Sequence, residues 1–256
     1  MVLITGASGG LGSVMAQRFA RGGDTVLVGY RHGREKAEKL VESIVAEGFK
    51  AQPLHVELTS SESVASALEQ AASDVGHIDV LINNAAYRPI GAFVDIPDSE
   101  WEEVLSVNVL GAVRCCRAVL PAMAEQGFGR IINISGLDAL HGGFERSHVT
   151  VSKTAIMGLS RAVAIEFGHL GVTANTVVPG SFKVWRDPKL YPYWEKLRQY
   201  LVSHTPAGRQ GEPDELAELC WYLSSNLAAF VTAQEIHING GLFPLLANPF
   251  LGGPSE

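Results

Sequence analysis

The chain has 256 residues, of which 46% are hydrophobic and 18% are charged, and its formal net charge is −7. This balance is typical of a folded globular protein and argues against disorder. The negative charge disfavours the broad basic surface that nucleic-acid binding needs. No apolar run approaches the roughly 20 residues that cross a bilayer, and the start MVLITGASGG lacks the basic region and cleavage site of a secretory signal. We therefore expect a cytoplasmic protein with small-molecule partners, no nucleic acid and no membrane.

The three cysteines are Cys115, Cys116 and Cys220. Their number is odd, two of them are adjacent, and their spacing is not that of a metal site. We expect reduced thiols in the core, with neither a disulfide framework nor a bound metal.

Short apolar runs rich in β-branched residues alternate with amphipathic stretches along the whole chain. Strands without polar alternation are buried on both faces, and strands that alternate with helices form parallel βαβ units. The pattern predicts one α/β domain over residues 1–256, built on a doubly wound (Rossmann) parallel sheet of about seven strands. The expected strands are residues 2–5, 25–30, 53–58, 79–85, 130–135, 172–178 and 235–240.

One long interruption follows the sixth expected strand, at residues 181–206, and combines aromatic residues, proline and mixed charge. A segment of this length inside a compact domain is often a lid or a substrate loop. An ordinary pair of surface helices is the alternative. Trp185 and Tyr191 within it would suit an apolar or aromatic substrate.

The first chemical motif is TGASGGLG, Thr5 to Gly12, directly after the first strand. Its glycines allow a tight turn and let backbone N–H groups approach a pyrophosphate at the N-terminus of the next helix. A glycine-rich loop alone is weak evidence, but this one opens a βαβ unit, which is the context that makes it specific.

Together with this loop, a series of motifs resembles the short-chain dehydrogenase/reductase family from Val2 to about Gly241. The motifs are NNAA (83–86, with Ala86 where glycine is usual), Asn108 in VNVLG, Lys153, PG (179–180), and GRQGEPDELAELCWYLSS with VTAQEIHINGG within 208–241. The resemblance implies a dinucleotide cofactor held by Gly6, Ser8, Gly10, Leu11, Gly12, Arg31, Glu57, Leu58, Asn84, Ala85, Lys153, Pro179 and Gly180.

The end of the second strand bears on the choice of cofactor. NAD-dependent enzymes place a carboxylate there for the ribose hydroxyls, whereas NADP-dependent enzymes offer a cation to the 2′-phosphate. The sequence reads VGYRHGREK, with Arg31 beside His32 and Arg34 and no carboxylate before Glu35. A guanidinium binds phosphate in bidentate fashion. We expect NADP(H) in preference to NAD(H), although Gly9 stands where a basic residue would strengthen the case.

The resemblance also implies a tyrosine that protonates the substrate carbonyl, a lysine four residues later that binds the nicotinamide ribose, and a serine that polarises the same carbonyl. Positions i and i+4 share a helix face, so the two side chains would lie side by side. In this chain the tyrosine position holds Val149 and the serine position holds Gly136. Of the implied catalytic residues only Lys153 and Asn108 remain, with Asn108 expected to hold a water that links the lysine to solvent.

Several residues near the vacated positions are candidates for proton transfer. His148 is the leading one, because it is adjacent to Val149, can donate a proton near neutral pH, and lies where a helix is expected to begin. Asp138 and Tyr87 are further candidates, and His141 follows them. The hydroxyl of Ser135 is expected to face away, since successive strand residues point to opposite sides.

Three functions remain open at this stage. The first is an NADP(H)-dependent carbonyl or alcohol oxidoreductase with a rearranged proton donor. The others are a non-redox enzyme on the same scaffold, such as an isomerase, lyase or dehalogenase, and a nucleotide-binding protein without chemistry. We also expect a homotetramer, because the helices near 100–126 and 150–169 carry apolar residues over much of their circumference and the tail 242–253 is apolar.

Overall fold

A computed structural model describes residues 1–185 and 194–243. Its centre is one parallel sheet of seven strands in the order β3-β2-β1-β4-β5-β6-β7, which confirms the predicted doubly wound α/β fold. The third strand begins two residues and ends three residues earlier than expected. The strands are β1 (Val2–Ile4), β2 (Val26–Tyr30), β3 (Ala51–His55), β4 (Val80–Asn83), β5 (Gly129–Ile134), β6 (Val172–Pro179) and β7 (Glu235–Ile238).

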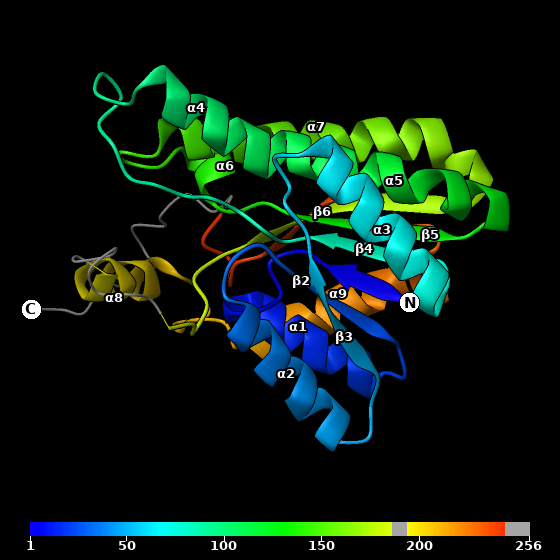
Figure 1. Cartoon of the computed structure of the whole chain (residues 1–256). Helices are drawn as coiled ribbons and strands as arrows, with labels where there is room; N and C mark the ends of the chain where they lie inside the picture. Colours follow the sequence, from blue (N-terminus) through cyan, green and yellow to red (C-terminus); the bar gives the residue numbers. More distant parts are fainter. Residues whose placement is uncertain (186–193, 244–256) are drawn as a thin grey trace, which may run out of the picture.

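Helices cover both faces of the sheet (Figure 1). One face packs against α1 (Gly10–Arg21), α2 (Arg34–Ala46) and α9 (Pro213–Ser224). The other packs against α3 (Ser61–Val75), α5 (Gly111–Gln126) and α7 (Ser147–Phe167), with α4 (Asp98–Leu105) beside α7. The remaining helices are α6 (Asp138–His141), α8 (Trp194–His204), the short turns η2 (Gly168–Leu170) and η3 (Asn226–Ala228), and the π-helical turn η1 (Ser106–Leu110).

The burial of the strands follows their sequences. All residues of β1, β2, β4 and β5 are buried, as expected for strands covered by helices on both faces. Strand β3 carries exposed residues and Pro53, and it lies at the edge of the sheet. Proline has no backbone N–H to donate, and proline is tolerated at an edge because one side of the strand has no neighbour.

The helical stretch from Asp98 to Gln126 consists of α4, η1 and α5. Among the described residues it is the one helix long and apolar enough to cross a membrane by length and composition. Half of its most apolar window is buried inside the protein. Its apolar residues Cys115, Cys116, Val119 and Met123 belong to the core under the sheet. The apolar character of this stretch is therefore accounted for by packing within the domain.

The order of the strands reverses direction between β1 and β4. Crossovers run to opposite faces from this point, and in doubly wound sheets ligands bind beside such a reversal, at the carboxyl edge of the sheet. The glycine-rich loop, Asn84 and Asn108 all lie at or beside this edge. The sheet thereby brings together motifs that are more than 100 residues apart in the chain.

Candidate active site

The glycine-rich loop is packed so closely that side chains are excluded at two positions. A methyl group on Gly12 would lie 2.6 Å from the carbonyl oxygen of Gly6, and one on Gly6 would lie 2.9 Å from the Cα atom of Ala85. Gly6 also has a φ of 63°, in the left-handed region. The turn therefore depends on glycine at both positions.

The N-terminus of α1 is open to an anion. Its cap residue, Gly9, forms no side-chain cap, and this fully described helix has no acidic residue in its first turn. No atom lies within 4 Å of a side chain placed on Gly9 or Gly10, among the residues that the structure describes. Free N–H groups, the helix dipole and open space beside Gly10 together fit a dinucleotide pyrophosphate.

A polar network fixes the loop to the end of β4. The hydroxyl of Thr5 accepts hydrogen bonds from the backbone N–H groups of Asn84 (3.0 Å) and Ala85 (3.1 Å). The side-chain amide of Asn84 donates to the carbonyl oxygens of Thr5 and Gly6, at 3.0 and 3.1 Å. These bonds hold the glycine turn in place before any cofactor binds.

The other residues expected at the cofactor line the same edge. Ser8 and Leu11 are half-buried in and after the glycine turn, and Ala85 closes against Gly6. Leu58 is buried against Gly111 of α5. Pro179 ends β6, and the following Gly180 approaches Asn239 so closely that a methyl group would lie 2.7 Å from its Cα atom.

Arg31, expected to meet the 2′-phosphate, is joined to Glu57 by an ion pair, and its Nη1 is 3.9 Å from the carboxylate of Glu103. Glu57 also accepts hydrogen bonds from the N–H (3.1 Å) and hydroxyl (2.7 Å) of Thr59. Burial raises the pKa of Glu57, but the bonds from Thr59 and the charge of Arg31 outweigh burial and leave it below its usual value. The cation is thus placed at the end of β2 but is flanked by two carboxylates.

Lys153 lies on the inner face of α7 and is only 5% exposed. Its ammonium donates to the carbonyl oxygen of Ile134 at 2.8 Å. Burial and then the positive charge of Arg88 lower the pKa of Lys153 from 10.5 to about 7, against a smaller opposing effect of Asp138. Lys153 can therefore hold or release a proton near neutral pH.

A cavity of about 10 Å³ adjoins Lys153 and is also lined by Thr5, Asn83, Asn108 and Ile134. This volume is about that needed for one water molecule, and its lining offers several polar partners. A much larger cavity of about 300 Å³ lies elsewhere, at the carboxyl ends of β6 and β7 beside Phe182 and Asn239. None of the expected proton donors lines that larger cavity.

Gly136 and Ser135 follow β5 and differ in their surroundings. A side chain on Gly136 would meet no described atom within 4 Å, so the position opens onto free space. The hydroxyl of Ser135 is buried and donates to the carbonyl oxygen of Lys153 at 2.9 Å. Ser135 thus joins β5 to α7 and its hydroxyl is not available at the position of Gly136.

His148, the leading candidate to act in place of the family's tyrosine, contacts α4 in the structure. It is 0% exposed, its Nε2 lies 3.2 Å from the carboxylate of Glu100, and its ring packs against Trp101 at a centroid distance of 5.7 Å. It is in the first turn of α7, as predicted, but that turn presents it to α4. The neighbouring Val149 is also fully buried.

Asn108 is buried in the π-helical turn η1, and its side chain bonds to the segment after β4 and to α7. Its Oδ1 accepts from the N–H of Tyr87 at 2.8 Å, and its Nδ2 donates to the carbonyl of Tyr87 at 2.9 Å and to the hydroxyl of Ser152 at 3.0 Å. Ser152 in turn donates to the carbonyl of Val149 at 2.8 Å. Both amide hydrogens of Asn108 are therefore used to fix the segment after β4 against α7.

The remaining candidates are Tyr87, Asp138 and His141. Burial, and then the charges of Glu103 and Glu100, raise the pKa of Tyr87, so its phenol stays protonated. Asp138 begins α6, is close enough to attract Lys153 electrostatically, and lies 3.7 Å from Arg146. His141 is exposed, and its Nδ1 is 2.6 Å from the carbonyl oxygen of Gly142.

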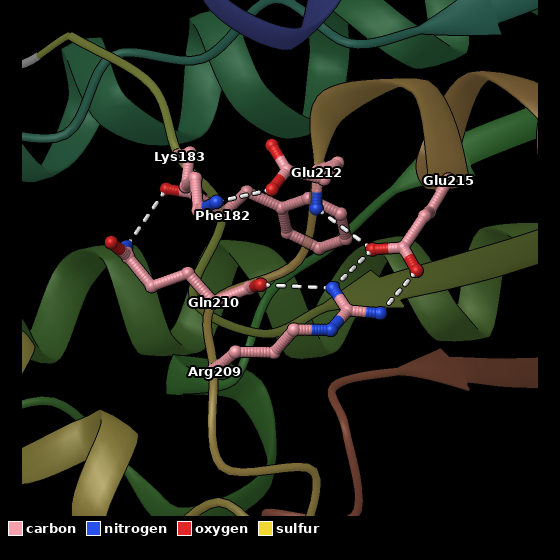
Figure 2. A network of polar contacts seen from close by, with 6 residues as sticks. All are labelled: Phe182, Lys183, Arg209, Gln210, Glu212 and Glu215. Atoms are coloured by element: carbon pink, nitrogen blue, oxygen red, sulfur yellow. Dashed lines mark hydrogen bonds and ion pairs between the residues drawn. The ribbon is translucent and has the colours of Figure 1, made fainter.

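The expected lid falls partly outside the described residues, and Tyr191 is among those not described. Polar contacts hold the first described residues of this segment against residues 209–215, as Figure 2 shows. Gln210 donates to the carbonyl of Phe182 at 3.1 Å, Lys183 pairs with Glu212, and Arg209 forms two bonds of 2.8 and 2.6 Å with Glu215. Trp185 is 81% exposed, and α8 buries none of its described side chains. The part of the tail beyond Phe243 is also outside the described residues.

Sequence reasoning missed Arg88 and Ser152. Ser152 has no signal of its own, since a serine on a helix face is unremarkable. Arg88 stands five residues after the end of β4, at the edge where ligands bind in this class of sheet, and that position could have identified it.

Among the described residues no group of histidine, cysteine and carboxylate side chains could hold a metal ion. The three cysteines are buried free thiols, and burial raises the pKa of each to about 12.

Comparison with known proteins gives one consistent family. The model described as enoyl-(acyl carrier protein) reductase matches residues 6–243. The 3-oxoacyl-(acyl-carrier-protein) reductase FabG of Staphylococcus aureus is 30% identical, covering 94% of this chain and 97% of its own length. The subunit BbsD of (2S)-[(R)-hydroxy(phenyl)methyl]succinyl-CoA dehydrogenase from Thauera aromatica is 32% identical. The match covers 94% of this chain and 95% of BbsD.

Solved structures match over nearly the whole chain. A putative gluconate dehydrogenase from Agrobacterium tumefaciens superposes with a TM-score of 0.91 at 26% identity, covering 96% of both chains. A gluconate 5-dehydrogenase from Burkholderia cenocepacia J2315, solved with NADP and tartrate, gives a TM-score of 0.88 at 28% identity, covering 96% of this chain and 95% of its own.

Proposed function

Because the chain belongs to the short-chain dehydrogenase/reductase family of oxidoreductases, we propose that it interconverts a carbonyl and an alcohol in a small molecule with NADP(H), and that Lys153 takes the place of the missing tyrosine as proton donor. The observation that carries the proposal is the coexistence of a complete cofactor cradle with a buried lysine whose pKa is about 7. Position 136 lies in the loop after β5, and position 149 lies in the first turn of α7, the helix that carries this lysine.

The cradle fits a dinucleotide through the glycine turn, the uncapped N-terminus of α1 and the Thr5–Asn84 network. When bound, NADPH supplies the hydride. Gly6, Gly10 and Gly12 would hold the pyrophosphate, and Arg31 would meet the 2′-phosphate. The NADP bound to the Burkholderia enzyme supports this preference.

Lys153 is suited to the proton transfer because its two protonation states are close in free energy near pH 7. In the reductive direction its ammonium gives a proton to the carbonyl oxygen, which becomes the hydroxyl oxygen of the product. The neutral amine then takes a proton from solvent, and the water-sized cavity beside Asn108 provides room for a relay. In the oxidative direction the neutral amine accepts the proton from the alcohol.

The other candidates are less well placed. His148 is enclosed between α7 and α4. Burial and the charges of Glu103 and Glu100 raise the pKa of Tyr87, which makes its phenol a poorer proton donor. The carboxylate of Asp138 already has a cationic partner in Arg146, at 3.7 Å.

The test is the oxidation of NADPH with a panel of ketones, 2-oxo acids and 3-oxo esters, measured from pH 5.5 to 9. Reduction needs the ammonium, so its rate should fall as pH rises through about 7, whereas alcohol oxidation should rise through the same pH. Lys153→Met should lower turnover by about 10²- to 10⁴-fold. It should also weaken NADPH binding, which fluorescence titration measures separately, since Lys153 is expected to bind the ribose.

Lys153→Arg is the matched control, because it keeps the positive charge but cannot release a proton near neutral pH. It should retain more NADPH affinity than Lys153→Met while remaining inactive. Full turnover in either variant would overturn the assignment of Lys153. NADPH binding without oxidation by any member of the panel would favour a non-redox or inactive protein.

For the assembly we propose a homotetramer in the cytoplasm. Leu110, Val151 and Ile165 are exposed apolar residues on the two helices expected to pair across a twofold axis, and Ile165 is 81% exposed. Sedimentation should give a mass of four chains at micromolar concentration. A monomer under those conditions would contradict this assembly, and Ile165→Glu should dissociate it.

A further inference from the structure

Arg88 is held at the active-site opening by the clamp on its neighbour. Asn108 binds both the N–H and the carbonyl of Tyr87, so the backbone leading into Arg88 is fixed against α7. The side chain of Arg88 is half-buried, and its charge acts on Lys153. Arg88 is therefore one residue from the clamp that Asn108 forms, and Asn108 and Lys153 line the same small cavity.

Arg88 differs from the other cations around the site in its pairing. Arg31 is paired with Glu57, and Arg146 lies 3.7 Å from Asp138. No carboxylate in residues 1–185 or 194–243 forms an ion pair with Arg88. A half-buried guanidinium without an acidic partner has unused donors in the planar arrangement that matches a carboxylate.

The surroundings favour an anion at Arg88 and a neutral polar group opposite it. Free space adjoins Gly136 in the loop after β5. Asp138, beyond Gly136, would attract hydroxyl groups and repel a second anion. A ligand with a carboxylate at one end and hydroxyl or oxo groups along its length is complementary to this arrangement.

We propose that Arg88 binds the carboxylate of the substrate, so that the enzyme acts on hydroxy and oxo carboxylic acids. This inference rests on the proposed oxidoreductase function and specifies its substrate class. Binding of the substrate carboxylate at Arg88 would also affect the protonation of Lys153, the proposed proton donor. Because Arg88 repels the charge on Lys153, neutralising Arg88 with a carboxylate should favour the ammonium form that reduction requires.

The experiment compares acids with neutral polyols of the same carbon skeleton. Gluconate is paired with sorbitol, and threonate with threitol, and each is titrated by calorimetry into protein saturated with NADP⁺. The unmutated protein should bind each acid at least about tenfold more tightly than its polyol, since one charge-assisted bidentate contact is lost in the polyol.

Arg88→Met should remove this preference, and Arg88→Lys should retain only part of it because a lysine offers no planar pair of donors. Arg21→Met is the control, since it deletes an equal charge at the C-terminus of α1, at the opposite end of that helix from the cofactor cradle. It should bind like the unmutated protein. NADP⁺ affinity and the melting temperature of each variant show whether the fold and the cradle are intact.

Equal affinity for both members of each pair in the unmutated protein, or no binding of either acid, would overturn the inference. A preference that survives in a folded Arg88→Met would overturn it as well. These outcomes leave the proposed oxidoreductase standing if NADP⁺ binds and a carbonyl is reduced. If NADP⁺ does not bind, the proposed function fails, and the same titrations on the cofactor-free protein decide the role of Arg88.

Discussion

The two sides of the active-site crevice differ in how they depend on side chains. The expected cofactor side is formed mainly by backbone. It consists of a glycine turn in which an added methyl group would lie under 3 Å from its neighbours, an uncapped helix end, and hydrogen bonds from the side-chain amide of Asn84. The opposite side depends on single side chains, and the positions expected to hold a serine and a tyrosine hold Gly136 and Val149. Apart from Lys153, which is expected to serve both sides, different residues form the two sides, and each side can be tested by its own substitutions.

The largest effect is expected from closing the glycine turn. Gly12→Val places a branched side chain against the carbonyl of Gly6, where even a methyl group would be 2.6 Å away. We expect at least about a 100-fold loss of NADPH affinity, because the backbone must shift away from the geometry that holds a pyrophosphate. Fluorescence titration with NADPH measures it.

Gly9→Ala is the control within the same loop. Gly9 has an extended backbone and no described atom within 4 Å of an added side chain. Its NADPH affinity should stay within about threefold of the parent. Equal losses in both variants would show that the loop is sensitive to any added atom and would remove the argument from close packing.

Arg31→Ala tests whether the cofactor side also selects between nucleotides. Loss of one charge-assisted contact to the 2′-phosphate should weaken NADPH binding by about tenfold to a hundredfold and leave NADH nearly unchanged. Glu103→Gln should strengthen NADPH binding by about twofold to fivefold, because it removes an exposed carboxylate 3.9 Å from Arg31. Equal affinities for NADPH and NADH in the unmutated protein would contradict this role.

Restoring the expected pair tests the other side of the crevice. Gly136→Ser with Val149→Tyr should raise ketone reduction by at least about tenfold, provided that the phenol turns into the open space beside position 136. The pH dependence should also move away from pH 7, since the phenol would replace Lys153 as donor. The comparison is Gly136→Ser with Val149→Phe, which adds the ring without the hydroxyl. An equal rate in both double variants would mean that the phenol donates nothing.

The smallest effect on turnover is expected at His148. His148→Phe keeps the packing against Trp101 but removes the contact with Glu100. The free energy of unfolding should fall by about 1–3 kcal/mol, while turnover stays within about twofold. Urea unfolding and NADPH oxidation measure the two quantities. A tenfold loss of turnover at unchanged NADPH affinity would restore His148 as the proton donor.

Much of the fold could be predicted from the sequence because its signals are local. Buried parallel strands are continuous apolar runs, and the turn Thr5–Gly12 follows the first of them directly. The direction of His148 could not be predicted in this way. A residue in the first turn of a helix can face several neighbours, and the carboxylate that it meets, Glu100, is 48 residues away in the chain. Arg88 was missed for a similar reason, since its significance depends on which acids are near it in space.

The π-helical turn η1 has a consequence for the rotation of the two helices that it joins. An α-helix turns about 100° per residue, and the wider turn at Ser106–Leu110 sets α4 and α5 at different rotations about one axis. Deleting one residue there would turn one helix by about that angle against the other. The contact of α4 with His148 and the bonds of Asn108 to Tyr87 could then not form together. The rotation of α4 relative to α5, which η1 sets, therefore determines whether the contact of α4 with His148 and the bonds of Asn108 to Tyr87 can form together.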